Sequence, residues 1–307
     1  MPFTSPEPVL KTLLGNYTNT LPLKNGDLKP SGFSFEFADV KVPNRAFKRV
    51  VREQEFDVAE LAMVTCLQAI AYNKPYAMIP AVIGAGRYQH HCLVYNAERQ
   101  TLRVGQLKGK RIGIRAHAQT TVTWVRGILW DDYGVALDDV NWVTMEDGHL
   151  AEFPDPTHII RAPEGRTMVD MLLSGELDAA IIGTDLPDDP RLQPVLPDPH
   201  AAAQAWSLRN QTVPINHMVM VRKDMFQHRP DIVTQIYQLL AQSKARAERD
   251  KSAAVDLTPF GVEANRKALE VLIRNATDQK LLPRPLTVDE IFEDFYKSCR
   301  LGPFNKS

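Results

Sequence analysis

The order of apolar runs and helix-like segments is the feature that most constrains this chain of 307 residues. YAMIPAVI (76–83) is apolar throughout, which is typical of a strand covered on both faces. FDVAEL (56–61) has the pattern of a short strand, and the apolar spacing of LAMVTCLQAIAY (61–72) predicts a buried helix. Strands that alternate with helices predict right-handed βαβ units on a largely parallel sheet.

Two α/β regions of this kind follow one another along the chain. The other predicted elements are strands at 9–17, 33–40, 107–114, 140–145, 178–183 and 215–223, and helices at 46–54, 120–134 and 166–177. A proline-rich passage at 185–200 is expected to be a loop, and helices follow from Arg229 onward. We therefore expect a two-lobed α/β fold with an interlobe cleft and a helical C-terminal tail.

The lobes are expected to be discontinuous in the sequence. We predict that residues 1–92 plus 212–307 form lobe 1 and that residues 93–211 form lobe 2. Ligands in open α/β sheets bind outside the carboxyl ends of the strands. Those ends read GNYTNT, AEL, GAGRYQHH, RAHAQTT and GTDLP.

Charge and apolar content limit the partners. Lys and Arg number 36 against 37 Asp and Glu, so no overall field attracts nucleic acid or anionic lipid. No apolar run reaches the roughly 18 residues of a membrane span, and the N-terminus lacks the pattern of a secretory signal. We expect a cytoplasmic protein with a small-molecule partner, no nucleic acid and no membrane, and we leave a homo-oligomer open.

The sequence offers little for a metal or a cofactor. Cys66, Cys92 and Cys299 are scattered and form no CxxC pair. The eight histidines contain no HxxxH spacing, and neither a GxGxxG nor a Walker loop follows a strand. We expect no metal and no cofactor.

IGIRAHAQTTVTW (112–124) places several polar residues where a buried strand meets a helix. Arg115 there and Arg87 in GAGRYQHH are candidate carboxylate-binding residues, because a guanidinium matches a carboxylate in a bidentate way. The alternative for each arginine is that it is a surface residue or the partner of a structural ion pair. Thr120 and Thr121 open the helix, where a cap and an anion site are both compatible with the pattern.

Further candidates lie at the other strand ends. Asn16, Tyr17 and Thr18 end the first strand and are candidate substrate-binding residues, as is His117 with a weaker case. Asp178 is interpreted as structural, and Asp185 is a weak candidate. Glu60 follows a strand and precedes a helix, where it either faces the cleft as a proton donor or is stabilised by the helix dipole.

Histidines flank two of the predicted strands. His90 and His217 are candidate catalytic residues, because imidazole exchanges protons near neutral pH. A packed histidine with satisfied hydrogen bonds is the alternative for each.

The chain resembles a known fold and a known group of enzymes. LKGKRIGI, LLSGELDAAIIG and HMVMVRKD resemble the type II periplasmic-binding-protein fold. GNYTNTLPL, EFDVAEL, the histidine before LVY, TWVRGIL, APEGRTMVDMLLSGELDAAI, LPDPHAAA and PINHMVMVRK together resemble the 4,5-dihydroxyphthalate decarboxylase group.

The resemblance implies a cofactor-independent decarboxylase that acts on an aromatic (di)carboxylate bearing phenolic hydroxyls. His90 and His217 match histidines of the group, and Glu60 belongs to its FDxxEL motif.

The chain departs from the group's pattern at three places. Residues 115–119 replace a Pro-Glu-Tyr-Gln motif, residues 64–66 replace Ser-Ser-Tyr, and residues 87–90 replace Arg-Phe-Arg-His. The substrate is therefore expected to be 4,5-dihydroxyphthalate or a relative. A solute-binding protein of an ABC-type uptake system, which binds a small carboxylate without chemistry, is the alternative function. A ligand sensor is a third, and no basic arm or DNA-binding segment supports it.

Overall fold

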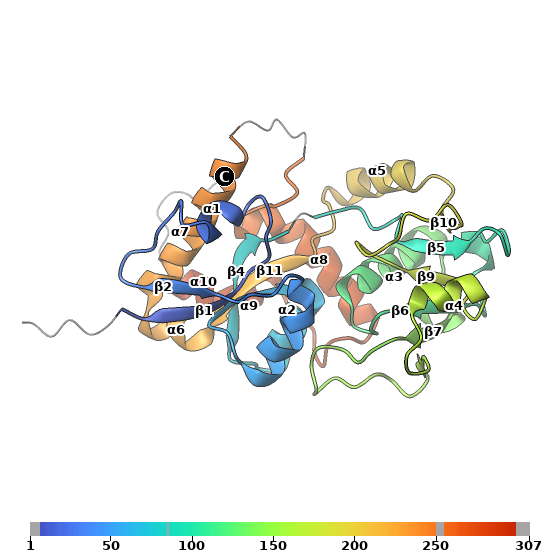
Figure 1. Cartoon of the computed structure of the whole chain (residues 1–307), viewed down its shortest axis with the longest axis horizontal. Helices are drawn as coiled ribbons and strands as arrows, with labels where there is room; N and C mark the ends of the chain where they lie inside the picture. Colours follow the sequence, from blue (N-terminus) through green and yellow to red (C-terminus); the bar gives the residue numbers. More distant parts are fainter. Residues whose placement is uncertain (1–6, 85, 250–254, 299–307) are drawn as a thin grey trace, which may run out of the picture. The chain divides into compact units, whose positions relative to one another are not determined.

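A computed structural model describes residues 7–84, 86–249 and 255–298 of the chain (Figure 1). The chain divides into two compact units, each built from segments that are distant in the sequence. Unit 1 comprises Met1–Gly86, Ile215–Glu270 and Arg284–Ser307, and unit 2 comprises Arg87–Pro214 and Val271–Pro283. Among the residues that the structure describes, no helix is both long enough and apolar enough to cross a membrane.

Unit 1 contains a five-stranded sheet in the order β2-β1-β3-β11-β4. Its strands are β1 (Val9–Leu13), β2 (Ser34–Phe37), β3 (Val58–Ala62), β4 (Tyr76–Val82) and β11 (His217–Arg222). β1 pairs in parallel with β2 and β3, whereas β11 runs antiparallel to both of its neighbours, β3 and β4. The sheet is therefore mixed. Its antiparallel pairs are those of β11, which comes from a distant part of the chain.

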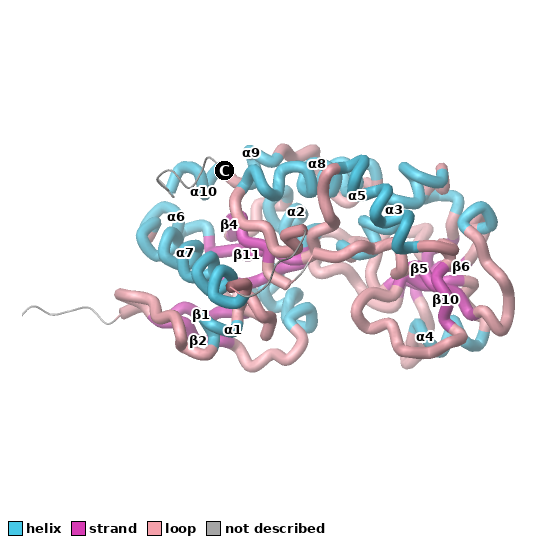
Figure 2. Tube along the Cα trace, turned by 90° about the horizontal axis from the view of Figure 1, so that it is seen from above, coloured by secondary structure: helices cyan, strands magenta, loops and turns pink. Residues whose placement is uncertain are grey.

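Helices pack against this sheet, so that β3 and β4 are buried along their whole length. α2 contacts β3, β4 and β11, while α6 and α7 lie side by side and both contact β4 (Figure 2). The helices of unit 1 are α1 (Leu21–Lys24), α2 (Met63–Ala71), α6 (Lys223–His228), α7 (Pro230–Ala247), α9 (Val288–Ile291), α10 (Glu293–Ser298) and the first half of α8 (Val262–Asp278).

A segment near α8 covers the free edge of β4. Ala81 and Phe260 form an antiparallel bridge, Gly261 N donates to Pro80 O at 2.8 Å, and Val82 N donates to Pro259 O at 3.3 Å. Pro80 lacks an N–H group, which restricts proline in a sheet to edge positions of this kind. Because an unpaired edge is a template for aggregation, this cover also protects the sheet.

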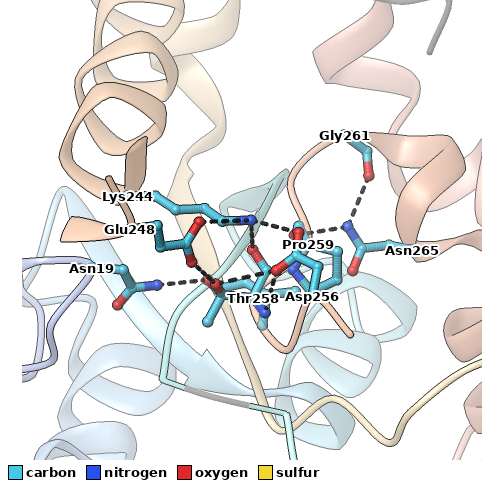
Figure 3. A network of polar contacts seen from close by, with 9 residues as sticks. Asn19, Lys244, Glu248, Asp256, Thr258, Pro259, Gly261 and Asn265 are labelled. Atoms are coloured by element: carbon cyan, nitrogen blue, oxygen red, sulfur yellow. Dashed lines mark hydrogen bonds and ion pairs between the residues drawn. The ribbon is translucent and has the colours of Figure 1, made fainter. Parts of the chain in front are cut away.

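Side chains of α7 and α8 hold the covering segment (Figure 3). Lys244 Nζ donates to Asp256 Oδ2 at 2.6 Å and to Thr258 O at 2.7 Å. Thr258 Oγ1 donates to Glu248 Oε1 at 3.2 Å, and Asn265 Nδ2 donates to Gly261 O at 2.8 Å. These contacts fix the segment that follows residue 254.

Unit 2 contains a six-stranded sheet in the order β10-β5-β9-β6-β7-β8. Its strands are β5 (Leu93–Asn96), β6 (Arg111–Ile114), β7 (Asn141–Thr144), β8 (Ile160–Arg161), β9 (Ala179–Ile181) and β10 (Leu192–Pro194), and its helices are α3 (Thr120–Tyr133), α4 (Met168–Ser174), α5 (Pro199–Asn210) and the second half of α8. β6, β7, β8 and β9 are parallel, and β5 runs antiparallel to its two neighbours.

The core of unit 2 has two layers, one on each face of its sheet. Ile112 and Ile114 of β6 belong to a cluster with Val122, Val125 and Leu129 of α3. The other cluster contains Met171 and Leu172 of α4. α3 and α4 accordingly lie on opposite faces of the sheet (Figure 2).

Gly113 shows why β6 reads Ile-Gly-Ile. A Cβ atom at this position would lie 2.5 Å from Leu177 Cδ1 and 3.1 Å from Met168 Cγ. The face of β6 opposite Ile112 and Ile114 therefore has no room for a side chain. Glycine permits this close approach of Leu177 to the strand.

Three of the predicted local structures differ from the observed ones. Residues 46–54 form a 3₁₀ turn and a π-helical turn, Pro43–Ala46 and Arg49–Glu53, in place of a regular α-helix. The proline-rich passage contains β10, which pairs antiparallel with β5; Ala97 N donates to Arg191 O at 2.8 Å, and Val195 N donates to Leu93 O at 2.9 Å. Thr120 is the first residue of α3, and Gln119 is the N-cap. Gly134 ends α3 in the left-handed conformation, as predicted.

Candidate functional site

In unit 1, Glu60 of β3 is a fully buried carboxylate with 0% exposure. Its Oε2 accepts a hydrogen bond from Gly15 N at 2.6 Å. Its Oε1 accepts from Tyr17 Oη at 2.8 Å and pairs with His217 Nδ1 at 3.0 Å. A buried charge is tolerated only when it is paired and hydrogen-bonded, and these three contacts meet that requirement.

The sheet order brings the members of this cluster together. β3 lies between β1 and β11, so Gly15 and Tyr17 follow β1 on one side, and His217 begins β11 on the other. His217 is paired with Ala62 in the antiparallel ladder, two positions from Glu60. Adjacent strands therefore position three groups whose sequence positions are far apart.

The contact between Glu60 and His217 fixes the orientation of the imidazole. With Nδ1 donating to the carboxylate, Nε2 is the nitrogen left to exchange a proton. The His217 side chain is 24% exposed, so it is not sealed from solvent as Glu60 is. The Phe47 ring packs edge-on against the imidazole with ring centroids 5.2 Å apart, which supports the ring from its side.

Two glycines make room for the Tyr17 ring. A Cβ atom at Gly15 would lie 2.5 Å from Tyr17 Cε2, and one at Gly84 would lie 3.2 Å from Tyr17 Cζ. Burial, followed by the charge of Glu60 and the hydrogen bond to it, raises the pKa of the Tyr17 hydroxyl. The neutral form of Tyr17 is therefore favoured, and it donates its hydroxyl hydrogen to Glu60.

Asn16 and Thr18 lie beside this cluster in the sequence and are exposed. Neither has a side-chain hydrogen bond within the described part of the chain. Thr20 fixes the turn instead, because its Oγ1 donates to Gly15 O at 2.6 Å and accepts from Tyr17 N at 3.0 Å.

Lys24 is a member of this neighbourhood that sequence reasoning missed. Its Nζ donates to Leu14 O at 2.6 Å. Burial lowers the pKa of Lys24, and the charge of Glu60 acts in the opposite direction. No sequence signal marks this lysine, since it lies in a short helix with ordinary composition.

In unit 2, the Arg87 side chain lies beside the first turn of α3. Its Nη2 is 3.4 Å from Thr121 Oγ1, and a Cβ atom at Gly183 would lie 2.6 Å from the same nitrogen. Arg87 Nε is buried without a hydrogen-bond partner, and no carboxylate pairs with Arg87 among residues 7–84, 86–249 and 255–298. This cation is therefore available for an anion beside a helix N-terminus, where Thr120 and Thr121 lie.

Arg115 differs from Arg87 because it already has an acidic neighbour. Its Nε lies 3.5 Å from Glu146 Oε1, an ion-pair distance, although the geometry is not that of a hydrogen bond. Its carbonyl accepts from Glu146 N at 2.9 Å. The alternative of a structural ion pair thus applies to Arg115 and not to Arg87.

His117 is 2% exposed and packs against Arg126 of α3. The His117 Nδ1 atom is 3.5 Å from Arg126 Nη1, which also donates to the His117 carbonyl at 3.0 Å. Burial, and then the charge of Arg126, lowers the pKa of His117 to about 3. The imidazole is therefore neutral near pH 7.

His90 is also buried, with 2% exposure, and neither ring nitrogen has a hydrogen-bond partner among the described residues. Its ring is 6.3 Å from that of Trp206, in an edge-on arrangement. Burial lowers the pKa of His90 to about 4, so this imidazole is neutral near pH 7 as well.

Asp178, which was interpreted as structural, has structural contacts. Asp178 accepts from Arg111 N at 2.9 Å and from Lys110 Nζ at 3.1 Å, so it joins β6 to the start of β9. Within the described residues, no group of three or more His, Cys, Asp or Glu side chains is arranged to hold a metal ion. Cys299 lies outside the described residues.

Sequence comparison identifies two relatives. No protein-family model matches the chain. It is 30% identical over 279 residues to a 4,5-dihydroxyphthalate decarboxylase of Comamonas testosteroni, covering 86% of this chain and 84% of that protein. It is 31% identical over 210 residues to a 4,5-dihydroxyphthalate decarboxylase of Pseudomonas putida, covering 64% of this chain and 80% of that protein.

Comparison of structures identifies the fold. The periplasmic aliphatic sulphonate binding protein SsuA from Escherichia coli aligns with a TM-score of 0.54 and 11% identity, over 93% of this chain and 92% of that one. Protein AF1704 from Archaeoglobus fulgidus aligns with a TM-score of 0.52 and 14% identity, over 94% of this chain and 96% of that one. The predicted periplasmic-binding-protein-like fold is confirmed.

Proposed function

The chain belongs to the 4,5-dihydroxyphthalate decarboxylase family, and from this premise we propose that it removes carbon dioxide from an aromatic carboxylate that bears phenolic hydroxyls, 4,5-dihydroxyphthalate or a relative. The pair formed by Glu60 and His217 carries the proposal, because this reaction requires a group that moves protons between oxygen and carbon.

His217 performs the proton transfers in the proposed reaction. Its Nε2 accepts the proton of a phenolic hydroxyl para to the carboxylate, so that the oxygen's electrons enter the ring. The imidazolium then gives the proton to the ring carbon that bears the carboxylate. The bond from this carbon to the carboxylate breaks, its electron pair restores the aromatic ring, and carbon dioxide leaves. The resulting phenolate takes one proton from solvent.

Glu60 supports both steps without contacting the ring. Its carboxylate holds Nδ1 as the donor, which leaves Nε2 as the base, and its charge stabilises the imidazolium that forms. Tyr17 and Gly15 donate to the same carboxylate and keep it in place. We propose Glu60 and Tyr17 as positioning residues.

We propose Arg87, with Thr120 and Thr121, as a carboxylate-binding group. The guanidinium has no acidic partner in the described residues and lies against Thr121 at the first turn of α3. An anion bound there would accept hydrogen bonds from the guanidinium and would be stabilised by the N-terminus of α3. Asn16, Thr18, His90, Arg115 and His117 remain predictions for the site.

The test measures carbon dioxide released from phthalates and hydroxybenzoates by the full chain. We expect turnover by the wild type and a fall in kcat of about 10²–10⁴-fold in His217→Asn and in Glu60→Gln, the range for loss of general acid-base catalysis. His228→Ala, which changes an exposed histidine of the same unit, serves as the matched control and keeps wild-type turnover.

Two outcomes oppose the proposal. Turnover that persists within threefold in both His217→Asn and Glu60→Gln contradicts the assignment of the pair. A wild-type chain that binds aromatic carboxylates tightly and releases no carbon dioxide from any of them is a solute-binding protein, and the proposed reaction is then wrong.

A further inference from the structure

Unit 2 contains a cavity that the proposed reaction does not use. Its volume is about 420 Å³, within the usual range for small-molecule sites. It is formed by the outer part of α3, the segment that follows it, and the second half of α8. The lining residues are Arg126, Gly127, Leu129, Trp130, Val135, Ala136, Leu137, Trp142, Asn275, Asp278 and Gln279.

Most of the lining is apolar, and two tryptophans dominate it. Trp142 is 2% exposed and donates from Nε1 to Leu137 O at 2.8 Å, which holds the segment after α3 in place. Trp130 is 56% exposed and lies at the opening. The exposed indole of Trp130 beside the opening suits contact with a flat aromatic ligand.

Arg126 places a positive charge in this apolar lining. It is 4% exposed, and its guanidinium carbon lies 4.1 Å from the centre of the Trp142 ring. No carboxylate forms an ion pair with it within the described part of the chain, and its Nε has no hydrogen-bond partner there. Burial lowers the pKa of Arg126 to about 9, and the charge of Asp155 acts in the opposite direction.

The other polar residues of the lining restrict which further groups the ligand can carry besides its carboxylate. Gln279 is 7% exposed, and its Oε1 has no donor among the described residues, while its Nε2 donates to Thr123 O at 2.9 Å. Asp278 is exposed at the rim. Two acceptors favour a ligand that carries a hydroxyl donor. The charge of Asp278 opposes a second carboxylate, so a monoanion fits better than a dianion.

We propose that this cavity binds a hydroxylated aromatic monocarboxylate, with the carboxylate at Arg126, the ring against Trp130 and the hydroxyl at Gln279 or Asp278. The proposal is independent of the proposed decarboxylation, because the cavity shares no residue with the proposed catalytic and carboxylate-binding groups.

The test is a titration of the full chain, followed through the indole N–H signals of ¹⁵N-labelled tryptophan. The probes are 4-hydroxybenzoate, its neutral analogue 4-hydroxybenzamide, and phthalate as a dianion. We expect 4-hydroxybenzoate to shift the Trp142 and Trp130 signals saturably. The amide and phthalate should bind about 10- to 100-fold more weakly, as expected for loss or repulsion of a charged contact.

Two variants localise the binding. Ala136→Trp fills the cavity from an extended backbone position (φ −74°, ψ 152°) and should abolish the shifts. Ala201→Trp, on the exposed side of α5, should leave them unchanged. Arg126→Met should remove the preference for the carboxylate over the amide, and Ala136→Trp keeps the test valid if that variant fails to fold.

The proposal is overturned if the two indole signals do not respond saturably to millimolar 4-hydroxybenzoate. It is equally overturned if the amide binds as tightly as the acid, or if the shifts survive in Ala136→Trp. Carbon dioxide release by Ala136→Trp should match the wild type, so failure of this proposal and failure of the proposed reaction give different results.

Discussion

Arg87 and Arg115 show how one residue type has two different surroundings in the same unit. Arg87 has no acidic partner within the described residues and contacts Thr121, whereas Arg115 lies 3.5 Å from Glu146. A guanidinium that already lies beside one carboxylate binds a second carboxylate less favourably. Both arginines are candidate carboxylate-binding residues from the sequence, and their neighbours in the structure distinguish them.

This difference predicts unequal effects of the same substitution. Arg87→Met should raise KM for an aromatic carboxylate by about 10- to 100-fold, because a hydrogen bond to a charged group is worth about 1.5–3 kcal/mol. Arg115→Met, the matched control, should change KM less than threefold. Steady-state kinetics of the two variants checks this, and a larger effect in Arg115→Met contradicts it.

The two buried histidines of unit 2 predict acid sensitivity. Burial lowers the pKa of His90 to about 4 and that of His117 to about 3, whereas histidine in an unfolded chain titrates near 6.5. Between these values the unfolded state binds more protons than the folded state. The contribution of each histidine to stability is therefore complete above about pH 6.5 and is lost as the pH falls toward the folded value.

His90→Phe isolates this effect, since phenylalanine keeps a ring against Trp206 and cannot titrate. The free energy of unfolding should fall between pH 7 and pH 5 by about 1–2 kcal/mol less in this variant than in the wild type. Urea unfolding at both pH values measures the difference. His200→Gln, an exposed histidine of α5, should retain the wild-type pH dependence, and equal dependence in His90→Phe would refute the prediction.

At the scale of elements, β6 illustrates a strand whose two faces have different requirements. Ile112 and Ile114 pack on α3, and Gly113 lies against Leu177. Gly113→Ala should reduce the free energy of unfolding by about 1–3 kcal/mol, the usual effect of overpacking a core. Denaturant unfolding measures it, and Leu177→Ala in the same chain should recover part of the loss.

Gly105→Ala provides the control for this substitution. A Cβ atom at Gly105 would have no neighbour within 4 Å, and its backbone is not left-handed. Its stability should therefore stay close to that of the wild type. If Gly113→Ala is as stable as Gly105→Ala, the close approach of Leu177 does not restrict residue 113.

The helices and strands were largely predictable from the sequence, whereas the pairing of the strands was not. HMVMVRK predicts a strand because its residues are apolar and β-branched, yet its antiparallel direction depends on β3 and β4, which lie far away in the sequence. Glu60 was a candidate from its predicted place after a strand, but it lies inside β3, and its contacts with Gly15 and Tyr17 depend on the order of the sheet. Short-range patterns specify helices and strands; pairing depends on tertiary packing.

Arg126 could have been found from the sequence. It follows Val122 by four residues, so it shares the buried face of α3 with an apolar residue. A charged residue on a buried face is uncommon and indicates a special environment. Lys24, in contrast, offers no such pattern.

At the scale of the whole molecule, each unit depends on a segment from elsewhere in the chain. Residues 271–283 complete unit 2, where Gln279 Nε2 donates to Thr123 O at 2.9 Å and Gly127 leaves room for Asn275 against α3. The fragment 87–214 alone should therefore expose the surface of α3 and unfold without cooperativity.

Circular dichroism and binding of a hydrophobic dye test the fragment. We expect strong dye fluorescence and a broad thermal transition for residues 87–214. A fragment in which 271–283 is joined through a flexible linker should bind less dye and melt more sharply. Identical behaviour of the two fragments would show that 271–283 is dispensable for unit 2.

The late position of β11 also sets the timing of events during synthesis. His217 is added 157 residues after Glu60, which at about 5–20 residues per second is a delay on the order of ten seconds. Throughout that interval β3 and β4 lack the strand that lies between them, and the Glu60 carboxylate lacks its imidazole. A nascent chain released before β11 is made therefore lacks the pair of Glu60 and His217. The proposed reaction becomes possible only after the sheet of unit 1 is complete.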